Sequence, residues 1–270
     1  MSPEIIAHRG ASADAPENTL ASIQLAWDQG ADAAEIDVLL TRDGQLVVIH
    51  DDTTLRTGVI DWAVAGHSLA ELKTLDVGSW KSPRFAGERI PTLTEVLDII
   101  PPGKRLFIEV KCGPEAILEL LLVLDAARTA REQTVLISLD FNTIVAVKRA
   151  IPDRLAFWVT EQSVRDVAGQ SALSPPTSEL IAQAIAAGLD GLDINDLPQR
   201  PSGDIALIRQ TGLQTCVWTV NTIERANWLR DEGMQSLTTD VPASLIAALN
   251  GIYRAVCSMR SGKLETYLEE

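Results

Sequence analysis

The sequence predicts a (β/α)₈ TIM barrel, with a small lobe inserted after the second strand. Short apolar runs alternate with segments of helical periodicity nearly to the end of the chain, a pattern typical of repeated βα units around a parallel sheet. Eight such pairs can be counted, and the length of 270 residues suits a fold that commonly uses about 250 residues as one domain. A doubly wound open sheet is the lesser alternative.

The predicted strands are short, and most are rich in aliphatic and β-branched residues. They are EIIAH (4–8), AAEIDV (33–38), RLFIEV (105–110), TVLIS (134–138), RLAFWV (154–159), GLDIN (191–195), QTCVWTV (214–220) and QSLTT (235–239). The predicted helices follow them at 18–30, 92–100, 114–130, 142–150, 178–188, 205–212, 223–233 and 241–249. Several of these segments end in glycine, as helix C-termini tend to do.

Residues 1–250 are therefore expected to form a single domain. One segment departs from the alternation of strands and helices. After the strand-like run QLVVIH, residues 51–89 are rich in Thr, Gly, Ser and Asp and only weakly periodic. We interpret them as an insertion that shapes the substrate pocket, because insertions at this end of a barrel usually do so. Residues 251–270 are expected to form a C-terminal tail, helical or frayed, and no function is assigned to it.

Charge and composition limit the partners. The net charge of −14 disfavours nucleic acid and stable association with an anionic membrane, since both would repel the protein. An anionic small-molecule substrate would need local positive charge. Three isolated cysteines suggest reduced thiols, and the seven residues before His8 lack a signal-peptide pattern, so a cytoplasmic location is expected. The oligomeric state stays open, with a homodimer among the alternatives.

Reactive side chains gather where the predicted strands end, which is the active-site face of a barrel. The first strand ends in His8 and Arg9, and a later extended run ends in His50 and Asp51. Two further pairs are spaced two residues apart within strands, so that each pair points to one face. These pairs are Glu35 with Asp37, and Glu109 with Lys111.

Three carboxylates in one small volume repel each other unless a cation or protons neutralise them. Glu35, Asp37 and Glu109 offer oxygen ligands only, which favours Mg²⁺ or Ca²⁺, with Mn²⁺ as a further candidate, over Zn²⁺. A structural alternative is that Glu35 and Asp37 pair with surface lysines. Their strand is otherwise apolar and would be buried on both faces, however, and unpaired carboxylates there need a reason.

His8, His50, Arg9 and Lys111 are candidates for proton transfer and phosphate binding. Two imidazoles with ordinary pKa values of about 6.5 can exchange protons near neutral pH. Arg9 and Lys111 supply donors for a phosphate group, although Lys111 could instead simply neutralise Glu109. A metal, paired imidazoles and cationic donors together indicate hydrolysis of a phosphate ester.

The motifs resemble those of the glycerophosphodiester phosphodiesterases over Ile5 to Leu249. The matching stretches are AHRGASADAPENTLASI, AEIDVLLTRDGQLVVIHDDTTLRTG, IPTLTEVL, LFIEVK, VWTVN and TTDVP. The resemblance implies a barrel with an inserted lobe and metal-dependent hydrolysis of a glycerophosphodiester to glycerol 3-phosphate and an alcohol.

The resemblance also implies a role for each matching residue. His8 and His50 match the acid–base pair, and we take His8 as the base and His50 as the acid. Arg9 and Lys111 match phosphate contacts, Trp218 matches an aromatic on the glycerol side, and the three carboxylates match the metal ligands. Supporting roles fall to Glu17, which could hold Arg9 or reach the metal's outer shell, and to Asn18, which could cap the first helix. Apart from the resemblance, Asp51 is expected to cap or orient His50, with a role as a metal ligand as the alternative.

Several points stay open at the level of sequence. The segments GLDGLDIND and SLTTDVP fit the family loosely, which leaves the leaving group undetermined, and Trp62, His67, Trp80 and Phe85 of the insertion could contact it. The nucleophile is either water or the glycerol hydroxyl, which would give a cyclic phosphate. Two other functions are a barrel lyase or racemase with Lys111 as base, and a non-catalytic sensor of a phosphate metabolite.

Overall fold

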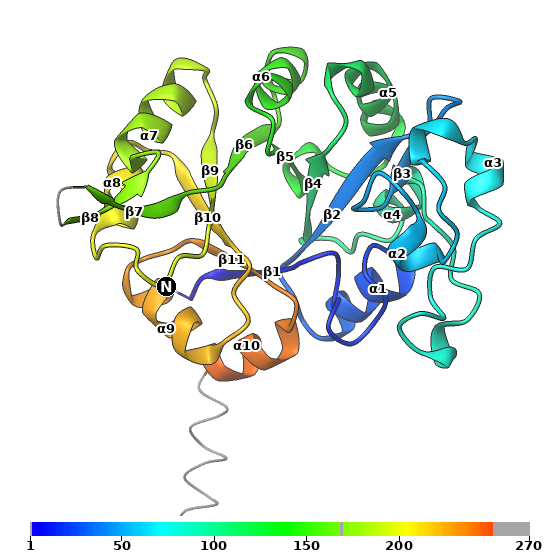
Figure 1. The fold of residues 1–270 in the computed structure, drawn as a ribbon, viewed down its shortest axis with the longest axis horizontal. Coiled ribbons are helices and arrows are strands. Elements are labelled where there is room, and N and C mark those ends of the chain that lie inside the picture. Colours follow the sequence, from blue (N-terminus) through cyan, green and yellow to red (C-terminus); the bar gives the residue numbers. More distant parts are fainter. Residues whose placement is uncertain (1, 168–169, 251–270) are drawn as a thin grey trace, which may run out of the picture.

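The computed structural model describes residues 2–167 and 170–250, in which eight parallel strands close into a barrel (Figure 1). The ring closes because β1 pairs with both β2 and β11. In order around the ring, the strands are β1 (Glu4–Ala7), β2 (Ala33–Leu40), β4 (Arg105–Val110), β5 (Thr134–Ser138), β6 (Leu155–Thr160), β9 (Gly191–Asn195), β10 (Gln214–Trp218) and β11 (Ser236–Thr239). The predicted fold class is thus confirmed, and each barrel strand lies within or overlaps a predicted run.

Helices surround the barrel and connect its strands (Figure 1). They are α1 (Leu20–Asp28), α4 (Leu93–Leu97), α5 (Ile117–Ala126), α6 (Phe141–Ala150), α7 (Thr177–Ala186), α8 (Asp204–Gln210), α9 (Ile223–Asp231) and α10 (Pro242–Leu249). Helix α1 begins after Thr19, whose hydroxyl accepts a hydrogen bond from the Ser22 amide. The expectation that Asn18 caps this helix is therefore wrong, and Asn18 is free for another contact.

The hydrophobic core has two layers. One fills the barrel with side chains that point inward, among them Phe107 and Phe157, whose rings meet edge to face with centroids 6.1 Å apart. The other lies between the strands and the surrounding helices and is dominated by Leu, Ile and Val. Barrels are packed in this way, so the space available to a ligand lies at the ends of the strands.

The inserted lobe follows β2 and begins with β3 (Leu46–Val48), which pairs antiparallel with β2. Short helical turns make up most of it: α2 (Leu55–Gly58), η1 (Val64–Gly66), α3 (Leu69–Leu72) and η2 (Pro83–Phe85). Its small apolar core includes Ile49, Leu72 and Ile90. Hydrogen bonds attach it to the loop after β1, among them those from Lys81 Nζ to the Ser12 carbonyl (2.7 Å) and from the Arg84 guanidinium to the Asp14 carbonyl (2.6 Å).

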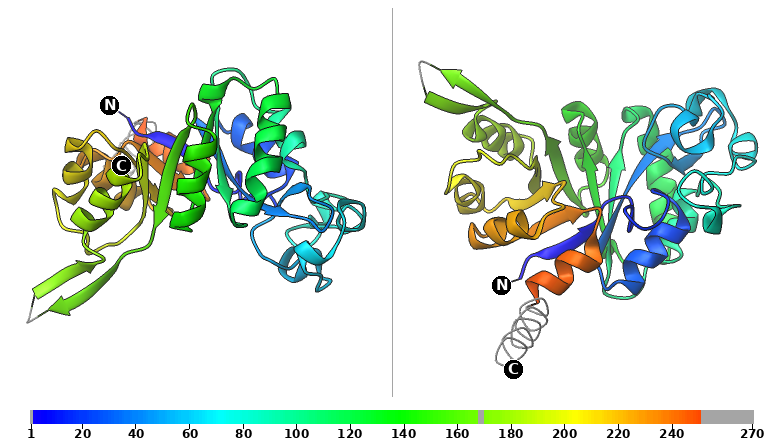
Figure 2. Two further views of the ribbon diagram at one scale, coloured as in Figure 1. Left: turned by 90° about the horizontal axis from the view of Figure 1, so that it is seen from above. Right: turned by 60° about the horizontal axis from the view of Figure 1, so that its bottom comes forward.

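A hairpin that the sequence did not predict lies between β6 and α7. Its strands, β7 (Ser163–Val167) and β8 (Gln170–Ser174), pair antiparallel and project from the barrel (Figure 2). The expected tail at 251–270 and Cys257 lie outside the described residues. Within the described ranges, no helix combines the length and the apolar character needed to cross a bilayer.

Packing inside the barrel predicts a specific sensitivity at Gly191, the first residue of β9. A Cβ there would lie 2.7 Å from Cδ1 of Phe157 and 2.9 Å from the Gln214 carbonyl oxygen. We expect Gly191→Ala to lower the free energy of unfolding by roughly 1–3 kcal/mol, the usual cost of overpacking. Urea denaturation would measure this, with Gly66→Ala as control because its added Cβ would meet only the Ala63 Cβ at 3.7 Å. Equal stability of the two variants would contradict this account.

Candidate active site

The candidate site lies at the carboxyl ends of the barrel strands, and strand register determines which side chains meet there. Asp37 of β2 is directly opposite Glu109 of β4. Ala7 of β1 is opposite Thr239 of β11, so that His8 leaves the sheet beside Asp240. Closure of the barrel therefore brings together residues from both ends of the chain.

Glu35, Asp37 and Glu109 form the acidic centre of the site. One carboxylate oxygen from each lies within 4.8 Å of the others, and Glu35 and Asp37 are only 4% and 1% exposed. Burial, together with the neighbouring carboxylates, raises the pKa of Glu109 to about 7 and the pKa of Glu35 well above its ordinary value. This buried set of oxygen donors fits a hard divalent cation, which would relieve the repulsion that otherwise favours the protonated forms.

Two cations and one amide border the acidic centre. Arg9 Nε lies 3.3 Å from an Asp37 oxygen, and Lys111 Nζ lies 3.8 Å from Asp37 and 3.9 Å from Glu109. Asn18 donates a 2.8 Å hydrogen bond to Asp37 and accepts one from the Asp37 amide at 3.2 Å. Asn18 thus orients a carboxylate instead of capping a helix, and the two cations stand where phosphate oxygens could meet them.

The turn after β1 aims the Arg9 backbone at the same centre. Arg9 has a φ of 54°, an uncommon conformation for a side-chain-bearing residue, and its amide donates to the Glu35 carboxylate at 3.0 Å. Gly10 follows with a φ of 80°, and a Cβ there would lie 2.5 Å from the Ser22 backbone. The glycine of the HRG motif is therefore required by a positive φ and by the close approach of α1.

Each imidazole is held by a carboxylate. Nδ1 of His8 lies 2.7 Å from Asp240, and Nδ1 of His50 lies 2.6 Å from Asp51. Burial alone would raise the pKa of Asp240, but hydrogen bonds from His8, Asn221 and Ser12 lower it to about 2. The pKa of Asp51 is also lowered to about 2, chiefly by hydrogen bonds from Arg56 and opposed by partial burial. Both partners are ionised at neutral pH and leave Nε2 of each ring available for proton transfer.

Arg56 of the inserted lobe connects the two halves of the site. Its guanidinium donates to Asp51 at 2.6 and 3.1 Å and to Glu17 at 2.6 and 2.9 Å. Glu17 in turn accepts a 2.8 Å hydrogen bond from Arg9. The carboxylate that orients His50 and the carboxylate that holds Arg9 thus share one arginine.

A cavity of about 130 Å³ lies at the carboxyl ends of the barrel strands, between the two imidazoles and the acidic centre. His8, Arg9, Glu35, His50, Glu109, Lys111, Ile137, Leu139, Asp193, Trp218 and Thr238 line it. Among the described residues, the Trp218 indole nitrogen is buried without a hydrogen-bond partner. The remaining predicted site residues, Asp37, Glu17, Asn18 and Asp51, lie behind this lining and contact it as described above.

Asp193, Asp240 and Arg56 were not predicted as site residues. Asp193 lines the cavity floor from β9, and burial followed by the charge of Glu109 raises its pKa to about 8. The sequence signal for Asp193 is a carboxylate within an otherwise apolar predicted strand, GLDIN. The same signal indicated Glu35. Asp240 follows β11 directly and contacts His8. Arg56 carries no comparable sequence signal.

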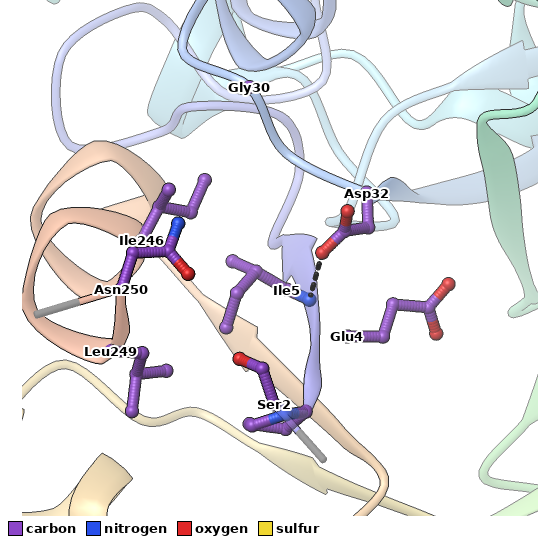
Figure 3. Close-up of a pocket in the computed structure, with 9 residues that line it drawn as sticks. Ser2, Glu4, Ile5, Gly30, Asp32, Ile246, Leu249 and Asn250 are labelled. Atoms are coloured by element: carbon purple, nitrogen blue, oxygen red, sulfur yellow. Dashed lines mark hydrogen bonds between the residues drawn. The ribbon is translucent and has the colours of Figure 1, made fainter.

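A cavity of about 470 Å³ at the opposite end of the barrel is distinct from this site (Figure 3). It is bordered by the start of β1 and the end of α10, and within it Asp32 accepts a 3.0 Å hydrogen bond from the Ile5 amide. Of the residues that the structure describes, no histidine or arginine lines it. In barrel enzymes this end generally serves stability, and the chemistry is accordingly assigned to the other end.

A closed barrel with two imidazoles and two cations around a carboxylate trio fits an enzyme of the phosphate-ester hydrolase class. Residues 8–244 match the glycerophosphoryl diester phosphodiesterase family. The chain belongs to this family, and it is therefore a phosphoric diester hydrolase. The inferred enzyme class and family are thus confirmed.

Individual relatives agree with this membership. A glycerophosphodiester phosphodiesterase from Caldanaerobacter subterraneus is 34% identical over 250 residues, covering 91% of this chain and 97% of the relative. One from Bacillus subtilis is 30% identical, covering 88% and 83%. The solved structure of an Oleispira antarctica phosphodiesterase in complex with the product sn-glycerol-3-phosphate is 31% identical, with a TM-score of 0.80 and coverage of 92% and 97%.

Loss of Arg56 should impair catalysis more than stability. Arg56→Met would leave Glu17 and Asp51 without their shared partner, and we expect kcat for diester hydrolysis to fall about 10–100-fold, as when other orienting partners of site residues are removed. Arg56→Lys should recover only part of the activity, because an ammonium cannot bridge two carboxylates in the same planar geometry. Steady-state kinetics with a melting-temperature measurement would test this.

The control for Arg56 is Arg42→Met, which breaks an exposed 3.0 Å pair with Glu71 in the same lobe. It should leave kcat unchanged. An Arg56→Met enzyme with the kinetics of the wild type would show that the network does not position the site.

Proposed function

We propose that this protein hydrolyses glycerophosphodiesters to glycerol 3-phosphate and an alcohol, with a divalent cation on Glu35, Asp37 and Glu109 and with His8 and His50 as the proton-transfer pair. The observation that carries the proposal is the single cavity into which both imidazoles, Arg9, Lys111 and two of the carboxylates open. A sensor would need the cations but no pair of carboxylate-held imidazoles. A lyase would leave His8 and Arg9 without a role.

The cation is Mg²⁺, Ca²⁺ or Mn²⁺, because the donor set consists of carboxylate oxygens. When bound, it would neutralise the carboxylates and the charge that develops on the phosphate. Arg9 and Lys111 bind the phosphate oxygens from the rim of the carboxylate trio. Trp218 borders the same cavity and packs against the glycerol carbons, which limits water access to the reacting phosphorus. The substrate class is further supported by the product named for the Oleispira antarctica relative.

Proton transfer needs one acid and one base near neutral pH. Asp240 and Asp51 each engage Nδ1 of their imidazole, so that Nε2 exchanges the proton in both cases. One imidazole accepts a proton from the attacking oxygen and the other donates a proton to the departing one.

Chelation provides the direct test. We expect release of glycerol 3-phosphate from glycerophosphocholine or glycerophosphoglycerol to stop in EDTA and to return with excess Mg²⁺, Ca²⁺ or Mn²⁺. Asp37→Asn and Glu109→Gln should lose activity by at least about 100-fold, in keeping with a role in charge stabilisation, whereas Glu224→Gln on the exposed face of α9 should not. Full activity in EDTA would refute the metal while leaving diester hydrolysis in place.

Binding of the cation should strengthen as pH rises from 6 to 8. The pKa of Glu109 is about 7 in the folded, metal-free protein, against an ordinary value of 4.5. Because the folded state binds this proton more tightly than the unfolded state, the proton's contribution to stability is present at low pH and is lost as pH rises toward 7. The cation must displace it below pH 7.

We therefore expect the rise in melting temperature caused by saturating Ca²⁺ or Mg²⁺ to be larger at pH 8 than at pH 6. Differential scanning calorimetry with and without the ion would measure it. Glu109→Gln cannot hold the proton and serves as the control, in which any remaining shift should depend less on pH. An equal shift at both pH values in the wild type would contradict the assignment of Glu109 as a ligand.

A further inference from the structure

Asp193 of β9 is a buried carboxyl that lacks a partner within the protein. Its side chain is 3% exposed and lines the cavity of about 130 Å³ that holds the two imidazoles. Within the described ranges, Oδ1 of Asp193 is buried and has no hydrogen-bond partner. A buried polar group left unsatisfied costs about 1–3 kcal/mol. This carboxyl therefore opposes folding unless a group from outside the chain binds it.

The neighbouring strands do not supply that group. In register with Asp193 are Val159 of β6 and Cys216 of β10, and both pack in the apolar interior of the barrel. Valine has no polar side-chain atom, and a thiol is at most a weak hydrogen-bond donor. The carboxyl of Asp193 can therefore meet a partner only in the cavity. The torsion about its Cβ–Cγ bond is broad, so that either oxygen can turn toward a ligand there.

Trp218 carries a second unpaired group on the next strand, β10. Within the part of the chain that the structure describes, its Nε1 is buried without a hydrogen-bond partner, and its side chain lines the same cavity. Trp218 lies two residues beyond Cys216, which is opposite Asp193, so Asp193 and Trp218 are diagonal neighbours on the inner face. An indole N–H only donates, and a carboxyl oxygen accepts. One hydroxyl satisfies both, because it donates one hydrogen bond and accepts others.

Other ligand groups fit this pair less well. Among the described residues, the carboxylates close enough to share a cation are Glu35, Asp37 and Glu109, and Asp193 is not one of them. An ammonium group would bind the carboxyl but offers no acceptor to the indole N–H. A phosphate group finds its cationic donors at Arg9 and Lys111, beside the acidic centre. The pair therefore fits an uncharged hydroxyl.

The barrel places this pair across the cavity from the acidic centre. In the ring of eight strands, β9 is four places from β2, and β10 is four places from β4 (Figure 1). Glu35 and Asp37 are on β2 and Glu109 is on β4. A substrate whose phosphate lies at the acidic centre thus meets Asp193 and Trp218 with a part that is remote from the phosphorus.

We propose that Asp193 and Trp218 bind the terminal hydroxyl of the glycerol arm and thereby select glycerol over smaller alcohols in that arm. This inference rests on the proposed function. The terminal hydroxyl is the one farther from the phosphorus, and it reaches β9 and β10 when the phosphate is held at Arg9 and Lys111. It donates a hydrogen bond to an Asp193 oxygen and accepts one from Trp218 Nε1. Asp193 is thus a specificity-determining residue and takes no part in proton transfer.

The test compares two choline diesters that differ by one oxygen. One is glycerophosphocholine, and the other has propane-1,2-diol in place of glycerol, in the matching configuration, so that it lacks only the terminal hydroxyl. The leaving choline and the hydroxyl next to the phosphate ester are the same in both. The ratio of the two kcat/KM values therefore isolates the terminal oxygen. We expect the wild type to prefer glycerophosphocholine by about 10–100-fold, the scale of a buried polar group left unpaired.

Two substitutions should abolish or weaken this preference. Asp193→Leu keeps the branched shape of the side chain without its polar atoms, and we expect the ratio to fall below about threefold. Its melting temperature should equal or exceed that of the wild type, because the substitution removes an unpaired buried group and no hydrogen bond within the protein. Asp193→Asn keeps an oxygen acceptor and should keep most of the preference. Trp218→Phe removes only the N–H donor from the pair and should lower the ratio by about threefold to tenfold.

Thr160→Val is the matched control. The Thr160 hydroxyl is also buried without a partner among the described residues, but Thr160 does not line the cavity. Its removal should leave the ratio at the wild-type value.

A wild type that hydrolyses both diesters equally well would overturn the proposal, and so would an unchanged ratio in Asp193→Leu or in Trp218→Phe. Failure of the wild type to release glycerol 3-phosphate from glycerophosphocholine would instead refute the proposed function, and this inference with it. The two failures are distinguishable because the first is seen in the ratio and the second in the activity itself.

Discussion

Mutual repulsion among Glu35, Asp37 and Glu109 is the constraint around which the site is built. Three carboxylates within 4.8 Å of one another, two of them almost completely buried, oppose folding unless positive charge or protons compensate them. The neighbouring groups compensate this negative charge, because the Arg9 amide and guanidinium, the Lys111 ammonium and the Asn18 amide face the three carboxylates. The unusual backbone of Arg9 follows from the same requirement, since its positive φ points the amide at Glu35.

The two imidazoles are held in similar ways but have different surroundings. Asp240 and Asp51 both have a pKa of about 2, so each engages Nδ1 as a carboxylate over the whole neutral range. Asp240 is bound by short polar groups from two other loops, Ser12 and Asn221, whereas Asp51 is bound by the long side chain of Arg56. Both rings line the same cavity, and the His50 side chain is the more exposed of the two, at 31% against 19% for His8.

Local periodicity was sufficient to predict the barrel and half of the site. Period-two spacing placed Glu35 with Asp37 and Glu109 with Lys111 on inward faces, because those relations lie within one strand. The contacts of His8 with Asp240 and of Glu17 with Arg56 span 232 and 39 residues, and they exist only once β1 has paired with β11 and the lobe has folded. The β7–β8 hairpin was missed because its serine-rich strands have neither a clear apolar face nor a recognisable turn.

The lobe does more than cover the barrel, because it holds the loop after β1 at several places. Arg56 binds Glu17 near the end of that loop, and Lys81 binds the Ser12 carbonyl near its start. His8 and Arg9 immediately precede this loop, so the position of the lobe and the position of Arg9 are coupled through short hydrogen bonds. A barrel strand end supplies the reactive groups, while the inserted segment sets both their orientation and the space next to them.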